Sequence, residues 1–336
     1  MQEKYKGTLS IIILSYFSGD RISKAYYRLK ELFSKEGIPF ELIIVDDGST
    51  DGTFDKNNAL AAKEENIVSR QLSRNYTSHY SAFAGLSIAS GDCCTMISDD
   101  EQEPYELLVQ MYHLWQKGHK VIIPYRDSRT DPFISKTFAG SFYKLFNYIS
   151  EVKYPYGGAD TWFIDRELVD IINDKIRPKQ TTTITEILRL GFSPVYIPYE
   201  RQKSINKKSR WTMKKKIKLA KDLIFSSSSW PIHTITNLGL TLSLLSFLLV
   251  LFFVYIRFFG NDKFWHVRNF PGWTSTVVII SFFSGLILLS LGVIAEYIWR
   301  IFEEVKDRPG YIIKKAVTNK HKGSTPNTTI ENDDNK

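Results

Sequence analysis

Two long apolar segments in the C-terminal part of the chain restrict its fold more than any other feature. Leu238–Ile256 and Val277–Ala295 contain no charged residue, and each is close to the ~20 residues that a helix needs to cross a bilayer. We therefore predict two transmembrane helices in a hairpin, with both flanks on one side of the membrane. A pair of buried core helices is the alternative, but such helices rarely stay free of charge over this length.

Positive charge is concentrated just before the first apolar segment. Lys203–Lys221 holds nine lysine and arginine residues and no acidic residue, whereas the loop between the segments carries three basic residues. Because lysine and arginine mark the cytoplasmic flank of a span, we expect a multi-pass protein of the plasma (inner) membrane whose head and tail are cytosolic. Cys93 and Cys94 agree with a reducing compartment, since adjacent cysteines are poorly placed to pair with each other.

The net charge of +8 does not by itself indicate nucleic acid as a partner. The positive charge lies beside a membrane span and is not spread over a recognition helix, so anionic lipid head groups are the expected partner. Within Trp211–Ile224 the apolar residues fall on one helical face. This pattern predicts an amphipathic interfacial helix on the cytosolic leaflet, and a solvated basic connector is the alternative.

Strand and helix patterns alternate along the first half of the chain. The expected strands are Leu9–Leu14, Phe40–Val45, Val68–Leu72, Cys93–Ile97, Val121–Pro124 and Val195–Ile197, and the expected helices are Arg21–Lys35, Ser78–Ala89, Glu103–Lys117 and Phe133–Ser150. This alternation predicts an α/β fold with a mainly parallel sheet, helices on both faces and a ligand site at the carboxyl ends of the strands. After Lys314 the polar composition predicts a disordered tail.

Two acidic motifs follow predicted strands. Asp46 and Asp47 follow the second expected strand and precede the turn residues Gly48 and Ser49. Ser98–Glu103 follows the fourth expected strand. Carboxylates this close repel one another unless a cation lies among them, and Mg²⁺ prefers carboxylate oxygen while keeping positions for phosphate. Together the motifs favour a metal-linked diphosphate site. Taken singly, the first motif is also explained by an ordinary acidic turn, and the second by the N-terminus of a helix.

These motifs belong to an ordered series that resembles the inverting nucleotide-sugar glycosyltransferases of the GT-A fold. Within that group the chain is similar to the polyprenyl-phosphate glycosyltransferases, such as dolichol-phosphate mannose synthase and bacterial undecaprenyl-phosphate glucosyltransferases. The resemblance extends from Leu9 to about Ile313. The segments that carry it are Ser10–Ile13, Val45–Thr53, Leu72–Asn75, Ala84–Leu86, Ser98–Pro104, Gly157–Asp160, Asp165–Arg166 and Lys208–Thr212.

The resemblance implies a membrane-anchored enzyme that moves a sugar from a nucleotide sugar, of the UDP type, to polyprenyl phosphate for cell-surface glycans. It implies a Mg²⁺ or Mn²⁺ cofactor bound by Asp100 and Gln102. Val45 and Asp47 would contact the nucleoside, and Asp99 and Asp100 would lie at the donor.

The resemblance also assigns roles on the acceptor side of the reaction. Arg126 would bind donor and acceptor phosphate, together with Arg129 and with Arg210 from the membrane-proximal segment. A guanidinium group suits this task because its fork matches phosphate oxygens. Asp160 takes the place of the proposed catalytic base.

On this basis the chain divides into four parts. They are a cytosolic GT-A catalytic domain (1–202), a basic juxtamembrane region with the interfacial helix (203–231), a transmembrane hairpin (232–300) and a cytosolic tail that is disordered at its end (301–336). The spans carry several serine and threonine residues that one hairpin is too small to shield, which predicts packing against sister subunits in a homo-oligomer.

Five positions depart from the pattern of the family. They are Leu14 in place of a proline, Ser18 and Ser98 in place of acidic residues, and Trp162 and Ser204 in place of arginines. Asp99 is the candidate to supply the carboxylate that Ser98 lacks. The departures keep open a pseudo-enzyme or scaffold that binds nucleotide sugar. A polysaccharide synthase subunit is a further alternative, although two spans are too few to form a channel alone and the chain lacks a Gln-x-x-Arg-Trp motif.

Overall fold

The computed structural model describes residues 7–128, 144, 146–150, 152–155, 158–179, 181–202, 228, 230–259 and 272–318. Some predictions therefore fall outside the described residues. These are the roles of Arg129 and Arg210, the basic stretch Lys203–Lys221 with the interfacial helix Trp211–Ile224, most of the helix Phe133–Ser150, and the chain after Thr318.

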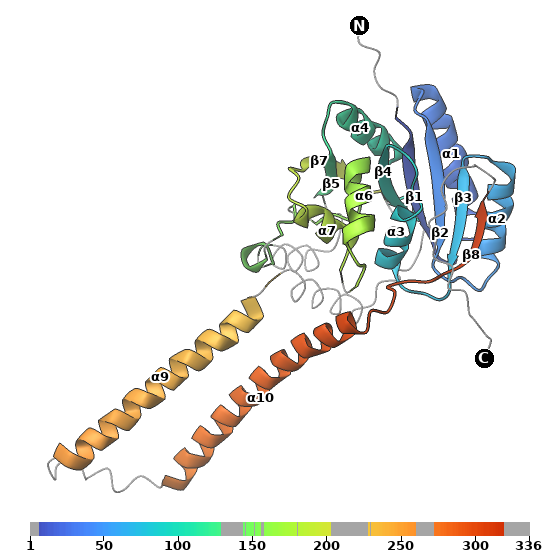
Figure 1. The fold of residues 1–336 in the computed structure, drawn as a ribbon. Coiled ribbons are helices and arrows are strands. Elements are labelled where there is room, and N and C mark those ends of the chain that lie inside the picture. The colour runs from blue at the N-terminus through green and yellow to red at the C-terminus, as the bar shows by residue number, and fades with distance from the viewer. Residues whose placement is uncertain are drawn as a thin grey trace, which may run out of the picture.

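One eight-stranded sheet forms the centre of the head, in the order β7-β5-β6-β4-β1-β2-β3-β8 (Figure 1). The strands are β1 (Leu9–Ser15), β2 (Phe40–Asp46), β3 (Ile67–Leu72), β4 (Cys93–Ser98), β5 (Val121–Ser128), β6 (Phe163–Asp165), β7 (Val195–Glu200) and β8 (Ile313–Thr318). The pairs β1–β2, β1–β4, β2–β3 and β5–β7 are parallel, whereas β6 and β8 pair antiparallel with their neighbours. The prediction of an α/β fold with a mainly parallel sheet is confirmed.

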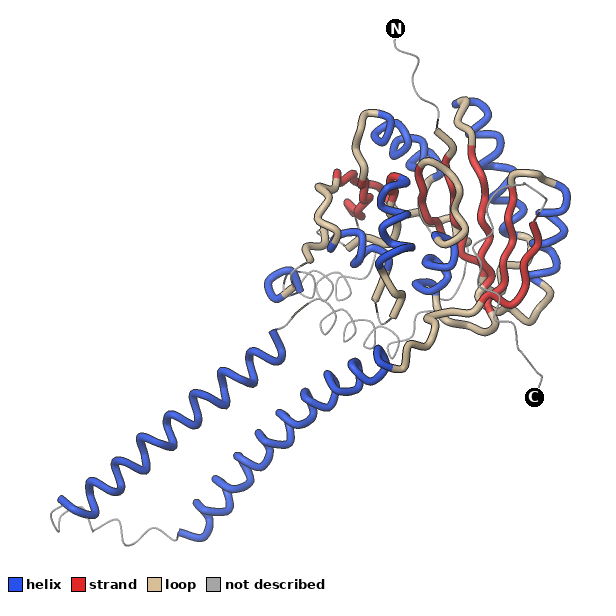
Figure 2. Tube along the Cα trace, in the orientation of Figure 1, coloured by secondary structure: helices blue, strands red, loops and turns tan. Residues whose placement is uncertain are grey.

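Helices cover both faces of this sheet (Figure 2). The helices are α1 (Arg21–Glu36), α2 (Thr53–Lys63), α3 (Ser78–Leu86), α4 (Tyr105–Gln116), α6 (Arg166–Lys175), α7 (Thr183–Arg189), α9 (Trp230–Phe259) and α10 (Gly272–Val305). Successive strand residues point to opposite faces, so Ile11 and Ile13 of β1 pack with α1, α2 and α4. Ile12 packs with α3, α6 and α7 on the other face. The head therefore has two apolar layers, one on each side of β1.

All six strands predicted from apolar runs are present, and α1, α3 and α4 are confirmed with shifted ends. The predictions had no counterpart for α2, α6, α7, β6 or β8. Helix α2 illustrates why its pattern was weak. It buries Thr53, Phe54, Asn57, Leu60 and Ala61, and two of these five are polar, so the apolar stripe that identifies a surface helix is interrupted. Both cysteines are buried and free, as predicted.

The predicted start of a disordered tail after Lys314 is wrong for residues 315–318. These residues belong to β8, which pairs antiparallel with β3 in the register Val68↔Thr318 and Arg70↔Ala316. An edge strand offers a row of unpaired backbone N–H and C=O groups. An extended segment can satisfy these groups whatever its side chains, so polar composition did not exclude a strand here.

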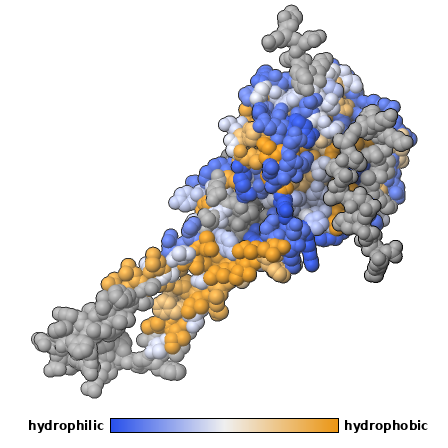
Figure 3. Space-filling model, in the orientation of Figure 1, coloured by the Kyte–Doolittle hydropathy of each residue, from blue (hydrophilic) through white to orange (hydrophobic). Residues whose placement is uncertain are grey.

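The predicted transmembrane segments lie in α9 and α10, which leave the head in the same direction (Figure 1). Among the described residues, one segment is long and apolar enough to cross a membrane, namely Phe282–Val305 in α10. The most apolar part of this segment is not buried inside the protein. Its surface is strongly apolar (Figure 3), and Leu288, for example, is 69% exposed. Crossing by α9 stays a prediction.

Gly85 provides a test of the packing between α3 and β1. A Cβ atom at this position would overlap Cγ2 of Ile12. Alanine normally stabilises a helix relative to glycine by about 0.5–1 kcal/mol. We expect Gly85→Ala to lower the free energy of unfolding instead, by about 1–3 kcal/mol, because it overpacks the core. Thermal and denaturant unfolding of the detergent-solubilised protein measures this change.

The matched control is Gly292→Ala in α10, where nothing lies within 4 Å of the added Cβ. This control should be neutral or slightly stabilising. If both variants had the same stability, α3 and β1 would not be in close contact.

Candidate functional site

The candidate site lies at the carboxyl edge of the sheet, where β1 pairs with β4 on one side and with β2 on the other. The order of parallel strands reverses at this point, and in open α/β sheets the diverging loops leave a ligand crevice there. A hydrogen bond joins the two loops beside the crevice: the hydroxyl of Ser18, after β1, donates to Oδ2 of Asp99, after β4, at 2.5 Å.

Asp46 is a structural residue. Its fully buried carboxylate accepts hydrogen bonds from the backbone N–H of Ser49 at 2.9 Å, from the Ser49 hydroxyl at 2.5 Å and from Nε2 of Gln71 at 3.1 Å. A buried charge is tolerated when its oxygens are hydrogen-bonded in this way. The contacts close the turn at Gly48, whose φ is +75° and whose added Cβ would meet the backbone of Arg74. Asp46 thus fixes the loop after β2.

Asp47 holds the start of α3. Its two carboxylate oxygens accept from the backbone N–H groups of Tyr76 at 2.7 Å and of Thr77 at 3.0 Å, directly before that helix. A carboxylate at a helix N-terminus satisfies free N–H groups and complements the helix dipole. The side chain of Val45 is fully buried, so this residue can offer a nucleoside only its backbone. The nucleoside contacts of Val45 and Asp47 stay predictions.

Asp99 and Asp100 are adjacent but have different partners. Oδ2 of Asp99 lies 2.5 Å from the guanidinium of Arg21, at the first turn of α1, as well as 2.5 Å from the Ser18 hydroxyl. Oδ1 of Asp100 instead accepts from the Ser98 hydroxyl at 2.7 Å. Asp99 is therefore tied to the loop after β1. A replacement of the carboxylate that Ser98 lacks would require it to leave these partners.

Ser98 stands between two carboxylates. Its hydroxyl lies 2.7 Å from Oδ1 of Asp100 and 3.2 Å from Oε2 of Glu103, and its single proton can serve only one of them at a time. Burial raises the pKa of Glu103, and the charge of Asp100 raises it further, while Arg201 and Arg126 act in the opposite direction. Glu103 therefore lies within the influence of one acidic residue and two arginines.

Arg201 is a site residue that the sequence interpretation did not identify. Its guanidinium donates to the side-chain oxygen of Gln102, and the backbone N–H of Gln202 donates to the Gln102 carbonyl at 3.0 Å. Arg201 directly follows β7, which is parallel to β5. The carboxyl ends of parallel strands share one edge of a sheet, so the position of Arg201 after a predicted strand was a usable signal.

Arg126 of β5 forms an ion pair with Asp160, which lies in the loop before β6. The arginine side chain is 12% exposed and the aspartate side chain is 45% exposed, so the guanidinium is largely buried and the carboxylate is open to solvent. Two predicted roles, phosphate binding and the catalytic base, thus fall on side chains in direct contact. Asp100 and Arg126 both act on the charge of Glu103. Val45 and Asp47 instead belong to β2 and the loop after it, and Asp99 is bonded to the loop after β1.

The predicted metal site has a sparse donor set. Among the described residues, no group of three or more His, Cys, Asp and Glu side chains is arranged to hold a metal ion. Mg²⁺ is commonly bound by one or two carboxylates together with substrate phosphates and water. The carboxylate of Asp100, at an edge that also presents arginines, fits a cation held jointly with a diphosphate. Gln102 fits less directly, because its oxygen already accepts from Arg201.

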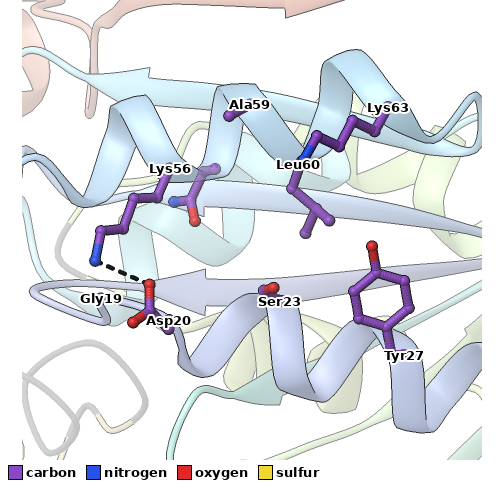
Figure 4. Close-up of a pocket in the computed structure, with 9 residues that line it drawn as sticks. Gly19, Asp20, Ser23, Tyr27, Lys56, Ala59, Leu60 and Lys63 are labelled. Atoms are coloured by element: carbon purple, nitrogen blue, oxygen red, sulfur yellow. Dashed lines mark hydrogen bonds and ion pairs between the residues drawn. The ribbon is translucent and has the colours of Figure 1, made fainter.

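A separate pocket of about 210 Å³ lies between α1 and α2 (Figure 4). Lys56 spans one end and forms an ion pair with Asp20 at 2.8 Å, and Tyr27 and Lys63 line the other part. None of the predicted site residues lines this pocket. The candidate site is therefore formed by the residues at the carboxyl ends of the strands, and this pocket is not part of it.

Comparison with known proteins places the chain in a family. Residues 10–170 match the family described as Glycosyl transferase family 2. A bactoprenol glucosyl transferase derived from the SfII prophage of Shigella flexneri is 33% identical, over 94% of this chain and 99% of that protein. An uncharacterized glycosyltransferase of Bacillus subtilis, YkcC, is 30% identical, over 91% of this chain and 93% of that protein.

Among solved structures, a mannosyltransferase from Pyrobaculum calidifontis, PcManGT, in complex with GDP-Man and Mn²⁺ is 15% identical, with a TM-score of 0.43 over 61% of this chain and 59% of that chain. A likeness this low bears on neither ligand nor mechanism. The sequence matches do establish the family: the chain belongs to glycosyl transferase family 2. It is a glycosyltransferase with a GT-A-like α/β head.

Glu103 gives a pH-dependent prediction. Its pKa is raised above the ordinary value of 4.5, so the folded protein holds this proton more tightly than the unfolded chain does. The associated stability is present at low pH and is lost as the pH rises through the folded-state pKa. Glutamine stays neutral at every pH, so we expect the Glu103→Gln variant to keep that stability. The difference in melting temperature between the variant and the wild type should therefore grow in favour of the variant from pH 5 to pH 8.

The control is Glu106→Gln, which changes an exposed residue in the first turn of α4. Its difference from the wild type should not depend on pH in the same way. A constant difference for Glu103→Gln across the same pH range would contradict the raised pKa.

Proposed function

We propose that this glycosyltransferase transfers a sugar from a nucleotide sugar to a polyprenyl phosphate at a membrane surface. The observation that supports it best is the meeting of acidic residues and arginines after neighbouring strands, where Arg126 pairs with Asp160, Arg201 contacts Gln102, and both arginines act on the charge of Glu103. Such an arrangement suits two phosphate-bearing substrates. The names of relatives that are bactoprenol glucosyl transferases support the acceptor class.

The donor in this proposal is a nucleotide sugar of the UDP type. Its nucleoside would lie toward Val45 and Asp47, with Asp99 near the donor. A divalent cation, Mg²⁺ or Mn²⁺, held by Asp100 and Gln102, would neutralise charge on the diphosphate and make it a better leaving group. Arg201 lies beside Gln102 and would add positive charge to the same side of the crevice.

The acceptor is already a nucleophile. A phosphate monoester has a second pKa near ~6, so at neutral pH its oxygen is largely ionised. In the proposed reaction this oxygen forms a bond to the anomeric carbon while the bond from that carbon to the diphosphate breaks, and the anomeric configuration inverts. Arg126, with Arg129 and Arg210, would bring the second anion into place. Asp160 would orient the acceptor or take its remaining proton.

The Arg126–Asp160 ion pair suggests an order of events at the acceptor side. Without substrate, Asp160 supplies the negative charge that the largely buried guanidinium requires. An arriving phosphate can take over that function, because it offers several acceptor oxygens in the fork geometry that arginine prefers. Asp160 would then be released toward the acceptor oxygen at the moment when it is needed.

The proposal includes the membrane arrangement predicted from sequence. Both apolar helices cross the inner membrane as a hairpin, the basic region 203–231 lies on the cytosolic leaflet, and the catalytic domain 1–202 faces the cytosol, where nucleotide sugars occur. The candidate span in α10 supports this arrangement. Assembly into a homo-oligomer, through the polar residues of the spans, belongs to the same proposal.

The test of the proposed function is a screen of the purified full-length protein in vesicles against a set of nucleotide sugars, with undecaprenyl phosphate as acceptor. We expect one donor to yield a polyprenyl-phosphate-linked sugar and free nucleoside diphosphate. Nucleotide-sugar binding without turnover would favour the pseudo-enzyme. A growing polysaccharide would favour the synthase.

Asp100 is predicted to be the main metal ligand. We expect Asp100→Asn to reduce turnover by about 100-fold or more, since charge stabilisation in a water-poor site is worth several kcal/mol. Chelation of divalent cations should inactivate the wild type, and added Mg²⁺ or Mn²⁺ should restore it. Initial rates of nucleoside diphosphate release measure both effects. Near-normal turnover in both tests would rule out the assignment.

Asp99→Asn is the companion variant. Because Asp99 is tied to Arg21 and Ser18, its removal should raise the KM for the donor without changing the metal concentration needed for half-maximal activity. A change in that metal concentration would instead show that Asp99 replaces the carboxylate missing at Ser98.

Asp160 can be separated from Arg126 by pH. If Asp160 takes the remaining acceptor proton, Asp160→Asn should slow turnover most below pH 6 and less at pH 8, where the acceptor is fully ionised. Arg126→Ala should lower turnover at every pH, because it removes a phosphate contact. The measurement is kcat/KM for the acceptor between pH 5.5 and 8.5. Parallel pH profiles for the two variants would contradict proton transfer by Asp160.

A further inference from the structure

The cytosolic end of α10 rests on a short segment of the head, residues 177–179. Nζ of Lys179 donates to the backbone carbonyl of Glu304 at 3.2 Å, and it lies 3.7 Å from the Glu304 carboxylate and 3.6 Å from that of Asp307. Arg177 forms a second ion pair with Asp307. The Lys179 side chain is only 13% exposed, whereas the side chains of Glu304 and Asp307 are 57% and 62% exposed. The lysine is therefore partly sheltered from solvent, and its carboxylate partners are not.

The chemistry of this contact is that of a helix cap supplied from another part of the chain. The last carbonyl groups of a helix lack intrahelical partners and carry the negative end of the helix dipole. Lys179 gives the Glu304 carbonyl a second donor, in addition to the backbone N–H of Asp307 at 3.1 Å, and places a positive charge beside it. Immediately afterwards Asp307 has a φ of +49°, which turns the chain out of the helix. A Cβ on Gly310 would overlap the carbonyl of Pro178, so the emerging chain also lies close against the same segment.

The segment that caps α10 continues directly into a part of the head that holds the candidate site. The following helix, α7, has Thr182 as its N-cap, and the hydroxyl of Thr183 accepts from the indole N–H of Trp162 at 2.9 Å. Trp162 is fully buried and follows Asp160 by two positions. The hydroxyl of Thr95, in β4, donates to the Trp162 carbonyl at 2.8 Å. The end of α10 and the loop of Asp160 are therefore connected by the ion pairs of Lys179, by the chain from Lys179 to Thr183, and by the hydrogen bond from Trp162 to Thr183.

We propose that Lys179 is a positioning residue that sets the height of the Asp160–Arg126 pair above the membrane. The inference rests on the proposed function. The phosphate of a bilayer-embedded lipid lies at a fixed depth, so the enzyme must hold its acceptor groups at that level to reach the reactive geometry. A head that is held against the end of the membrane helix by direct contacts keeps its acceptor groups at a constant depth. A head joined to that helix only by a flexible linker does not.

The experiment compares two acceptors in the same proteoliposomes: undecaprenyl phosphate in the bilayer and a water-soluble short-chain prenyl phosphate added from solution. The variant is Lys179→Met, which keeps the apolar stem and removes the charge. For the bilayer acceptor we expect KM to rise about fivefold, the ratio that corresponds to ~1 kcal/mol for a partly sheltered ion pair. KM for the soluble acceptor and for the nucleotide sugar should remain as in the wild type.

Two further variants serve as controls. Lys179→Arg keeps a positively charged donor at this position, so KM for the bilayer acceptor should stay at the wild-type value. Lys175→Met removes an exposed lysine at the end of α6, which forms no ion pair among the described residues, and should behave as the wild type.

The inference is overturned if Lys179→Met affects both acceptors equally, since that result indicates a general role in folding, or if it affects neither. A failure of the proposed function is recognised separately, because the wild type itself would then glycosylate neither prenyl phosphate.

Discussion

The parallel pairing of β1 with both β2 and β4 is the constraint on which the rest of the head depends. The interior of β1 is fully buried, with apolar layers on both faces. Because its two neighbours run in the same direction, three loops leave the sheet at one edge. A hydrogen bond from Ser18 to Asp99 joins the loops after β1 and β4, and one from Gln71 to Asp46 joins β3 to the end of β2. The position of the site is thus a consequence of strand order, and the side chains at the strand ends determine its chemistry.

The site also shows how a protein keeps opposite charges close together in a partly buried place. Arg21 is paired with Asp99, Arg126 with Asp160, and Arg201 contacts Gln102 next to Glu103. Removing an ion from water is costly, so each cation requires a partner before any ligand is bound. The partner of Arg126 is the exposed Asp160, and that of Arg201 is the half-buried Gln102.

The sequence predicted the strands and the acidic motifs well, because both depend on local features. Apolar runs located β1 to β5 and β7, and the strand-end rule placed Asp100 in the site. It could not distinguish Asp99 from Asp100, since their roles depend on contacts with Ser18 and Ser98 that only the folded chain defines. Arg201 was missed although the same strand-end rule, applied to β7, would have marked it. Strand β8 was missed because backbone pairing at a sheet edge leaves almost no mark on composition.

Strand β8 has a consequence for the order in which this protein is made. Its residues are synthesised after both long apolar helices, yet they pair with β3, which emerges from the ribosome early. Until then the edge of β3 lacks its partner, and contacts between segments so distant in the chain form slowly. The head can therefore complete its sheet only after α9 and α10 have been synthesised. A chain arrested before β8 would leave the edge of β3 unpaired, and an open strand edge is a template for pairing with other chains.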